Sequence, residues 1–480
     1  MNYAMIRYML GWVCCFEGTF MVLPLMTALI YGEQRSGLSF LAVMAVCGLI
    51  GSAAIRKKPK TKMMYAREGL VIVALSWIVL SILGALPFVI SGEIPSYVDA
   101  LFETISGFTT TGASILTDVE AMSRSCLLWR SFTHWVGGMG VLVFILAILP
   151  AKSSAASIHI MRAESPGPSV SKLVPRLRTT AMILYAIYFG MTVVEILLLL
   201  LGGMEPFDAL TLSFGTAGTG GFGVKNDSLA GYSPYLQWVV TIFMIAFGVN
   251  FNVYYLFLKK KWKQAAASTE VLVYLGIILV SGTVITLSVL SLYPKVSDAV
   301  RHTFFQVGSI ITTTGYATTD FNQWPVIAKT ILVILMFVGA CAGSTGGGIK
   351  VSRVVLLVKG IRKEIGMMCH PRGIKKVKMD GRVVEHEVMR SVNAFIAIYV
   401  VIFTVSLLIV SIEDKDMVTN FTAVAATINN IGPGLELVGP AGNFSQFTDL
   451  SKFVLMFDML AGRLELLPML MLFVPSIWKR

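Results

Sequence analysis

Four short tracts of threonine, asparagine and glycine recur along the 480-residue chain, and the chemistry that they offer is exposed backbone oxygen. They read TTTG at 109–112, AGTG at 217–220, TTTG at 312–315 and NNIG at 429–432. Glycine lets the chain turn sharply without a side-chain clash, so carbonyl oxygens can face one axis and replace the water shell of a cation. Dehydrating a bare ion costs on the order of tens of kcal/mol, so a ring of four tracts is physically sensible where one tract is not.

Each tract follows an aspartate-led segment that is too short to cross a membrane. Counting from Asp99, Asp208, Asp298 and Asp416 to the aligned glycines Gly112, Gly220, Gly315 and Gly432 gives offsets of 13, 12, 17 and 16 residues. The glycines are 108, 95 and 117 residues apart, so one unit recurs four times. We expect each aspartate to cap a short helix, whose C-terminal end would present partial negative charge to a cation.

The elements that position these tracts are predicted to be membrane-spanning helices. Hydrophobic residues make up 55% of the chain and charged residues 14%, which excludes a soluble domain of ordinary composition. Ten apolar runs approach the roughly 20 residues that a bilayer core requires. They lie near 8–30, 38–55, 69–91, 129–150, 180–201, 235–258, 270–293, 325–345, 391–412 and 452–475. Non-helical backbone at membrane depth is tolerated only where protein buries it or where it lines a water-filled cavity, so the four re-entrant segments indicate a central pore.

The expected fold is therefore an all-α integral membrane protein, in which two N-terminal helices precede four repeats of helix, re-entrant pore loop and helix around one central pore. The predicted units are a two-helix prefix (1–55), pore repeat 1 (56–155), pore repeat 2 (156–263), pore repeat 3 (264–358), a basic cytoplasmic linker (359–388) and pore repeat 4 (389–480).

The net charge of +12 follows membrane topology and does not indicate a nucleic-acid partner. Of the 39 lysines and arginines, 28 lie at 56–67, 151–178, 259–263, 350–390 and 479–480. The alternate connections hold only Arg35, Arg124, Lys225, Lys295, Arg301 and Lys415. Because basic loops stay on the cytoplasmic side, both termini are expected in the cytoplasm.

Three further motifs give the chain a family resemblance. With WVGGMG at 135–140, GACAGSTGGGIKVSR at 339–353 and LAGRLE at 460–465, it is similar to the membrane subunits of Trk/Ktr potassium transporters over essentially its full length. The two-helix prefix resembles the TrkH branch, and the four tracts look like degenerate potassium-channel filters with one aligned glycine each. The resemblance implies that the filter carbonyls belong to Thr111, Gly112, Thr219, Gly220, Thr314, Gly315, Ile431 and Gly432. The fourth tract departs most from the pattern, so we expect an asymmetric filter that passes potassium and rubidium, and sodium poorly.

The resemblance also implies a gate below the filter. It would consist of an intramembrane loop with Gly343, Ser344, Thr345, Gly346, Gly347, Gly348 and Lys350, together with Arg463 in the last helix. A nucleotide phosphate loop is the rival interpretation of GSTGGGIK, but no Ser or Thr follows the lysine and no strand precedes it. For Arg463 the alternative is a structural ion pair with Asp458 or Glu465.

The implied activity is potassium uptake across a bacterial cytoplasmic membrane, by a homodimer with one pore in each protomer. The implied partners are membrane lipid and a cytosolic TrkA-like regulatory subunit that binds NAD(H) or ATP/ADP and docks on the basic linker. Potassium is expected as the transported ion, and no organic cofactor is expected on this chain.

Two alternatives remain open from the residues. One is an H⁺- or Na⁺-coupled potassium symporter of the same architecture, which the sequence does not separate from a passive pathway. The other is a membrane-embedded enzyme, for which no H-E-x-x-H, G-x-S-x-G or paired-aspartate constellation is present, and the five histidines are scattered. The six cysteines show no C-x-x-C spacing, so they do not suggest a zinc site.

Several single residues have two interpretations each. Acidic residues that follow the tracts could concentrate cations at an outer mouth or lie in solvated loops: Asp118, Glu120, Asp227 and Asp320. Glu103 and Glu195 are candidates for a coupled proton or for structural hydrogen bonds. His134 and His302 lie beside pore elements, where a satisfied interfacial histidine is more common than a proton relay.

Overall fold

The computed structural model describes residues 1–59, 65–140, 177–370 and 376–478, and the chain there is almost wholly helical. Within these residues six helical segments are long and apolar enough to cross a membrane, at 3–31, 34–56, 67–91, 181–201, 269–292 and 386–413. This confirms the all-α membrane fold. The end of the fourth predicted span after residue 140, the basic segment 151–178, the predicted boundary between repeats 1 and 2, and the basic pair 479–480 lie outside the described residues.

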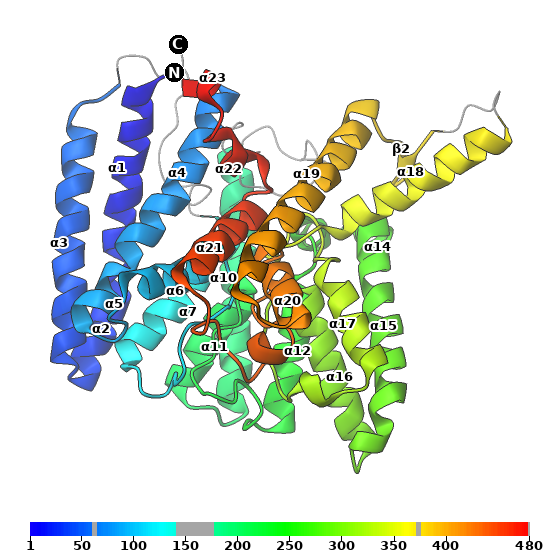
Figure 1. Cartoon of the computed structure of the whole chain (residues 1–480), viewed down its shortest axis with the longest axis horizontal. Coiled ribbons are helices and arrows are strands. Elements are labelled where there is room, and N and C mark those ends of the chain that lie inside the picture. Colours follow the sequence, from blue (N-terminus) through cyan, green and yellow to red (C-terminus); the bar gives the residue numbers. More distant parts are fainter. Residues whose placement is uncertain (60–64, 141–176, 371–375, 479–480) are drawn as a thin grey trace.

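The N-terminal prefix is a pair of spans at one edge of the molecule (Figure 1). Helices α1 (Tyr3–Phe20) and α2 (Val22–Tyr31) form the first span, and α3 (Gln34–Arg56) forms the second. They approach closely because small residues face each other, and a Cβ on Gly51 would lie 2.8 Å from the Gly11 carbonyl oxygen.

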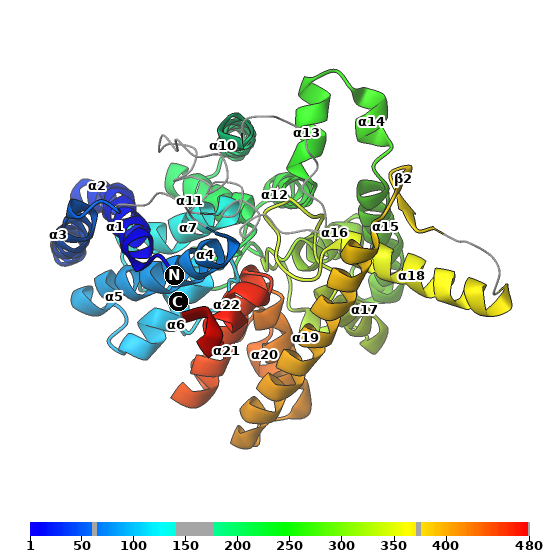
Figure 2. The same ribbon diagram turned by 90° about the horizontal axis from the view of Figure 1, so that it is seen from above.

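Four units of the same kind follow the prefix, and seen from above they succeed one another around a common centre (Figure 2). The first helices are α4 (Ala66–Gly84) with α5 (Leu86–Ser91), α10 (Leu177–Leu201), α15 (Thr269–Val289) and α19 (His386–Val410). The short helices that lead into the tracts are α6 (Tyr97–Phe108), α11 (Pro206–Gly218), α16 (Val296–Ile311) and α20 (Met417–Ile428). The second helices begin with α7 (Arg124–Met139), α12 (Pro234–Phe247), α17 (Val326–Met336) and α21 (Asp449–Arg463).

The aspartates that open the short helices are not all caps, contrary to the prediction. Asp416 does cap α20, since its Oδ1 accepts a hydrogen bond of 2.9 Å from the Thr419 amide. Asp99, Asp208 and Asp298 are instead the third residues of their helices, which begin two residues earlier than predicted. A carboxylate in the first turn still favours the positive end of the helix dipole, so the charge is retained although the cap is not.

Three predicted spans are not continuous helices. The run at 235–258 bends by 90° between α12 and α13 (Phe251–Leu258). The run at 325–345 is helical only through α17, after which the chain leaves the helix at 337–350. The run at 452–475 breaks after α21 and resumes as α22 (Leu467–Met471). Apolar composition does not reveal these breaks, because a buried loop and a helix can share it.

The remaining elements connect the four units on the two sides of the membrane. They are α14 (Trp262–Ala266), η1 (Leu290–Leu292), η2 (Phe321–Gln323), α18 (Val351–Cys369), η3 (Ser411–Glu413), η4 (Glu436–Val438) and α23 (Pro475–Trp478). Strands β1 (Lys378–Met379) and β2 (Arg382–Val383) form an antiparallel hairpin in which Lys378 pairs with Val383. Helix α18 projects from the body, and the marked chain ends lie together (Figures 1 and 2), where Tyr3 donates a 2.6 Å hydrogen bond to the Trp478 carbonyl.

Candidate functional site

The four tracts adopt one backbone conformation. The residue two positions before each turn glycine is left-handed, with φ of 55° at Thr110, 53° at Thr219, 59° at Thr313 and 55° at Asn430. The turn glycines follow with φ of 81° at Gly112, 81° at Gly221, 89° at Gly315 and 98° at Gly432. Side chains rarely adopt the latter values, which explains why glycine ends each tract.

The second tract is shifted by one residue from the predicted alignment. The amide of Gly220 donates a 2.8 Å hydrogen bond to the Gly215 carbonyl, as the amide of Thr111 does to the Ser106 carbonyl. Gly220 is therefore the equivalent of Thr111, and Gly221 is the equivalent of Gly112. The pair predicted from the sequence, Thr219 and Gly220, lies one position too early, because AGTGGFG contains two glycines that fit the pattern.

The four tracts close into a ring. A Cβ added to each turn glycine would touch the carbonyl oxygen that precedes the glycine of the next tract. In order around the ring, Gly112 meets Gly220, Gly221 meets Thr314, Gly315 meets Ile431, and Gly432 meets Thr111, the last with its Cβ 2.8 Å from the oxygen. These four carbonyls therefore lie at one level, with each tract packed directly on its neighbour.

The side chains behind this ring are not four-fold symmetric. In the first and third tracts, threonine hydroxyls pair across two residues, Thr109 with Thr111 at 2.8 Å and Thr312 with Thr314 at 2.7 Å. In the fourth tract the amide of Asn430 donates to the Thr111 hydroxyl at 2.9 Å. An asparagine amide thus joins the last tract to the first, so the replacement of threonine leaves the ring closed.

A buried ion pair supports the first tract. Glu103 in α6 and Arg130 in α7 are both buried, and Arg130 Nη2 lies 2.7 Å from Glu103 Oε1. The same carboxylate accepts a 3.0 Å hydrogen bond from the Ile115 amide, just beyond the turn. Glu103 is therefore structural, which was one of its two predicted interpretations. Sequence reasoning missed Arg130, although an arginine in an apolar helix is the expected cue for a partner.

His134 fills the space between the first two tracts. Its Nδ1 lies 2.8 Å from the Gly107 carbonyl oxygen, and its Nε2 accepts a 3.3 Å hydrogen bond from the Phe222 amide. Both ring nitrogens are satisfied, so His134 acts as a spacer behind the ring. His302 is also engaged, with Nδ1 2.9 Å from the Thr318 hydroxyl. Glu195 is fully buried in α10, and a role for it in proton coupling stays a prediction.

The glycine-rich segment 337–350 lies directly beneath the ring. The amide of Gly347 donates a 2.7 Å hydrogen bond to the Thr313 hydroxyl. A Cβ on Gly346 would lie 3.0 Å from the Thr312 carbonyl oxygen, and one on Gly347 would lie 2.7 Å from the Asn429 carbonyl oxygen. The tip of this segment, Gly346–Gly348, therefore packs against the inner ends of the third and fourth tracts.

Two cations hold the segment in place. Lys350 is buried and donates from Nζ to the carbonyls of Gly346 and Gly347. Arg463 donates from Nη1 to the Thr345 carbonyl at 2.7 Å, and from Nη2 to the carbonyls of Gly137 at 2.6 Å and Gly138 at 2.9 Å. Arg463 thus joins the tip region to the end of α7 from the opposite side of the pore.

The predicted ion-pair partners of Arg463 bind other groups. Glu465 pairs with Arg353, with Nη2 and Oε2 2.5 Å apart, and Asp458 Oδ1 accepts a 2.7 Å hydrogen bond from Ser406. Arg463 is also the last residue of α21, not a mid-helix residue. Its guanidinium is therefore free of the helix interior and can bridge backbone carbonyls.

On the opposite side, the acidic residues after the tracts are hydrogen-bonded. Asn226 donates from Nδ2 to Asp118 Oδ1 at 2.8 Å, and its amide donates to Glu120 Oε1 at 3.1 Å. The hydrogen bond from Asn226 lowers the pKa of the Asp118 carboxyl below its ordinary value. These residues join the connections after the first two tracts while remaining at the surface.

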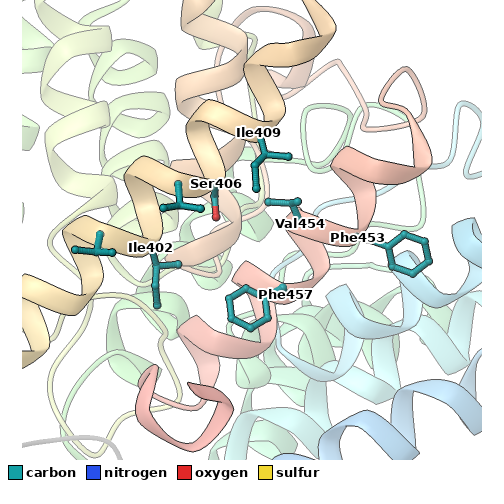
Figure 3. A pocket seen from close by; sticks show the side chains of 8 residues that line it. Ile402, Ser406, Ile409, Phe453, Val454 and Phe457 are labelled. Atoms are coloured by element: carbon teal, nitrogen blue, oxygen red, sulfur yellow. The ribbon is translucent and has the colours of Figure 1, made fainter. Parts of the chain in front are cut away.

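A cavity of about 330 Å³ lies apart from the tracts, between α19 and α21 (Figure 3). Its lining is apolar apart from the Ser406 hydroxyl: Val401, Ile402, Val405, Ser406, Ile409, Phe453, Val454 and Phe457. None of these lining residues is ionisable, so the cavity offers no chemistry comparable to the ring.

Comparison with known proteins agrees with this architecture. The TrkH family, described as a cation transport protein, matches residues 37–480. The chain is 36% identical to the Trk system potassium uptake protein TrkH of Salmonella typhimurium, over 97% of each chain. It is 32% identical to the Trk system potassium uptake protein TrkG of Escherichia coli, over 99% of this chain and 98% of that one.

A solved structure matches the whole fold. The crystal structure of the potassium transporter TrkH from Vibrio parahaemolyticus superimposes with a TM-score of 0.88, at 31% identity and with 100% of both chains covered. Since the family profile covers most of the chain and the relatives match along nearly its full length, this chain belongs to the TrkH family of cation transport proteins.

Proposed function

We propose that this chain takes up potassium across a bacterial cytoplasmic membrane through a pore whose selectivity filter is the ring of four tracts. The observation that carries the proposal is the closed ring of backbone carbonyls from Thr111, Gly220, Thr314 and Ile431. The names of the relatives, which are potassium uptake proteins, agree with it. Family membership also makes the chain a transport protein and not an enzyme.

In this proposal the filter carbonyls are those of the turn glycines and of the residues before them. They are Thr111, Gly112, Gly220, Gly221, Thr314, Gly315, Ile431 and Gly432. The short helices end at the ring, so their partial negative charges add to the attraction for a cation. Carbonyls take the place of the ion's water without any change in protonation, so selectivity rests on their spacing and number.

The gate in this proposal is the segment 337–350 with Arg463. The loop tip occupies the space beneath the third and fourth tracts, and Lys350 and Arg463 place two positive charges below the ring. A positive charge on the ion path opposes a cation by Coulomb repulsion. Uptake would then require the tip to withdraw and the guanidinium of Arg463 to release the Thr345 carbonyl.

The partners remain part of the proposal. A homodimer with one pore in each protomer would place the body in the bacterial inner membrane in contact with lipid. A cytosolic TrkA-like subunit that binds NAD(H) or ATP/ADP would dock on the basic linker 359–388. The common location of the chain ends supports placing both termini on the cytoplasmic side.

An H⁺-coupled symporter is the second candidate, and one buried carboxyl favours it. Asp458 in α21 is fully buried, and its Oδ2 has no hydrogen-bond partner among the described residues. An ionisable group in the membrane is a candidate proton carrier by default. Coupling predicts rubidium uptake that moves protons inward with it, whereas a passive pore predicts none.

The test is rubidium tracer uptake in bacteria that lack their own potassium uptake systems and express this chain with its regulatory subunit. We expect growth at low potassium, and rubidium uptake that excess sodium leaves largely unchanged. Loss of uptake in Gly315→Ser, with retention in Gly223→Ala at equal expression, supports the filter. Gly223 is the control because a Cβ there would make ordinary contacts of 3.4 Å at a negative φ. Unchanged rubidium selectivity in Gly315→Ser contradicts the proposal.

A further inference from the structure

One carboxylate oxygen binds both ends of the intramembrane loop. Glu270 lies in the first turn of α15, and its Oε1 accepts hydrogen bonds from the amides of Ala342 at 2.6 Å and Ser352 at 3.0 Å. The loop tip Gly346–Gly348 lies between these two amides. A single oxygen therefore holds the two arms of the loop together at its base.

The two arms also pair with each other through the backbone. The Gly339 amide donates to the Ile349 carbonyl at 2.7 Å, and the Val351 amide donates to the Ala340 carbonyl at 3.2 Å. Two such bonds between glycine-rich arms are weak support for a loop at membrane depth. Glu270 adds two more bonds at the same level, and it comes from a different helix, so it fixes the position of the loop as well as its shape.

Helix α15 is in turn tied to the cytoplasmic hairpin. Asp380, at the turn between β1 and β2, accepts a 2.8 Å hydrogen bond on Oδ1 from the amide of Thr269, the residue before Glu270. The same hairpin contacts the helix that follows the loop, since Lys359 Nζ donates to the Lys378 carbonyl at 2.8 Å. The hairpin therefore spans the two helices between which the loop is held.

We infer that Glu270 is the latch of the intramembrane loop, and that Asp380 connects this latch to the hairpin of the basic linker. The inference rests on the proposed gate and goes beyond it, because it names the residue through which the cytoplasmic side controls the loop. Displacement of the hairpin pulls on Thr269, moves the Glu270 carboxylate away from the two amides, and frees the tip from beneath the ring.

The readout is the reactivity of Cys341, a native thiol that lies inside the loop and is fully buried. The other five cysteines, of which Cys369 is exposed, are replaced by serine or alanine in the test background. The purified protein, without its regulatory subunit, is labelled with a charged methanethiosulfonate. In parallel, rubidium flux is measured in vesicles that contain the same protein.

Glu270→Ala is expected to raise both the Cys341 labelling rate and the rubidium flux, each on the order of tenfold, since it removes two hydrogen bonds to a charged acceptor. Glu270→Gln keeps an acceptor oxygen at the same place and should stay within about threefold of the parent protein. A role in folding alone would not produce this split, because both variants remove the charge. Equal rates in Ala and Gln overturn the latch.

Asp380→Ala tests the connection at an exposed site that leaves the membrane helices intact. It should raise Cys341 labelling about threefold, with Asp380→Asn close to the parent protein, since the loss is one exposed hydrogen bond. If Glu270→Ala does not fold, this pair alone decides the matter. The control is Asp449→Ala, which removes an exposed aspartate at the start of α21. Labelling in Asp380→Ala that equals the control overturns the connection.

Deletion of Gly346–Gly348 separates this inference from the proposed function. If the deletion raises rubidium flux and Glu270→Ala does not, the loop is a gate and the latch is wrong. If the deletion itself leaves flux unchanged, the loop is not the gate, and the latch falls with it.

Discussion

The ring of tracts and the layer beneath it are built in opposite ways. In the ring, four sequences as different as TTTG and NNIG adopt the same left-handed residue and the same glycine turn. In the layer beneath, four second helices that start alike end differently, at Met139, Phe247, Met336 and Arg463. Only the third continues into a long glycine loop among the described residues.

The difference follows from which atoms each region uses. The ring offers carbonyl oxygens, which every residue possesses, so a tract tolerates changes of side chain provided that its glycine remains. The lower layer relies on the side chains of Lys350, Arg463 and Glu270, each present once. A repeated backbone site can therefore diverge in sequence without losing its geometry, whereas a site made of single side chains breaks the symmetry.

The largest effect is expected from the turn glycines, whose equivalence the comparison asserts. Alanine at any of Gly112, Gly221, Gly315 or Gly432 should lower rubidium uptake at least about 100-fold, because each would place a Cβ against a neighbouring carbonyl at a left-handed φ. The measurement is initial uptake rate at equal expression, with Gly223→Ala as the tolerated control. One harmless variant among the four would break the equivalence of the tracts.

The next effect concerns the support of the first tract, where the repeats differ. Glu103→Gln should lower the free energy of unfolding by about 3–5 kcal/mol, because it leaves Arg130 as a buried charge without its carboxylate. Thermal unfolding of the purified protein gives the measurement.

Asp99→Asn in the same helix is the control for that substitution. Asp99 pairs with Lys452, with Oδ1 and Nζ 2.5 Å apart, but its side chain is 27% exposed. A partly exposed pair contributes about 0–1 kcal/mol, so its loss should change the melting temperature little. Equal shifts in the two variants would contradict the buried support.

A smaller effect is expected from Arg463, and it sharpens the contrast because it changes the lower layer alone. Arg463→Gln should raise rubidium flux about tenfold in the absence of the regulatory subunit, since hydrogen bonds from a charged donor to three carbonyls are lost. Selectivity over sodium should stay unchanged, because the ring is untouched. A loss of selectivity without a gain in flux would show that the two layers are not separate.

The smallest effect lies at the outer surface, where Asp118 accepts its hydrogen bond from Asn226. Its pKa is lowered, so the stability from this contact is present above the ordinary pKa and is lost as pH falls through the lowered value. Asn226→Ala should therefore reduce the melting temperature slightly at pH 6, and the difference from the parent protein should shrink below about pH 4. A difference that does not change with pH would contradict the assignment.

The sequence predicted the ring well because local pattern determines it. Threonine or asparagine followed by glycine, at the end of an apolar helix, is visible without any knowledge of the fold. The register failed only in the second tract, where Gly220 and Gly221 both fit, and the deciding feature is the φ of Thr219. A conformational angle leaves no mark in composition when two adjacent residues can satisfy it.

The lower layer was predicted less well, because its contacts are long-range. Arg463 was expected to find a carboxylate and instead binds backbone carbonyls from α7 and the loop. Carbonyls belong to every residue, so no sequence pattern identifies such a partner. Glu270 was missed for the same reason, since its two donors are amides more than 70 residues away. The bend in 235–258 had a cue in Gly248 and Asn250, where a helix is disfavoured.

The most direct test of the ring is anomalous X-ray diffraction from crystals of this protein grown with rubidium in place of potassium. The account predicts an anomalous peak on the pore axis, coordinated by the carbonyl oxygens of Thr111, Gly220, Thr314 and Ile431. Rubidium density elsewhere with this ring empty, or coordination by Thr219 in place of Gly220, would contradict it.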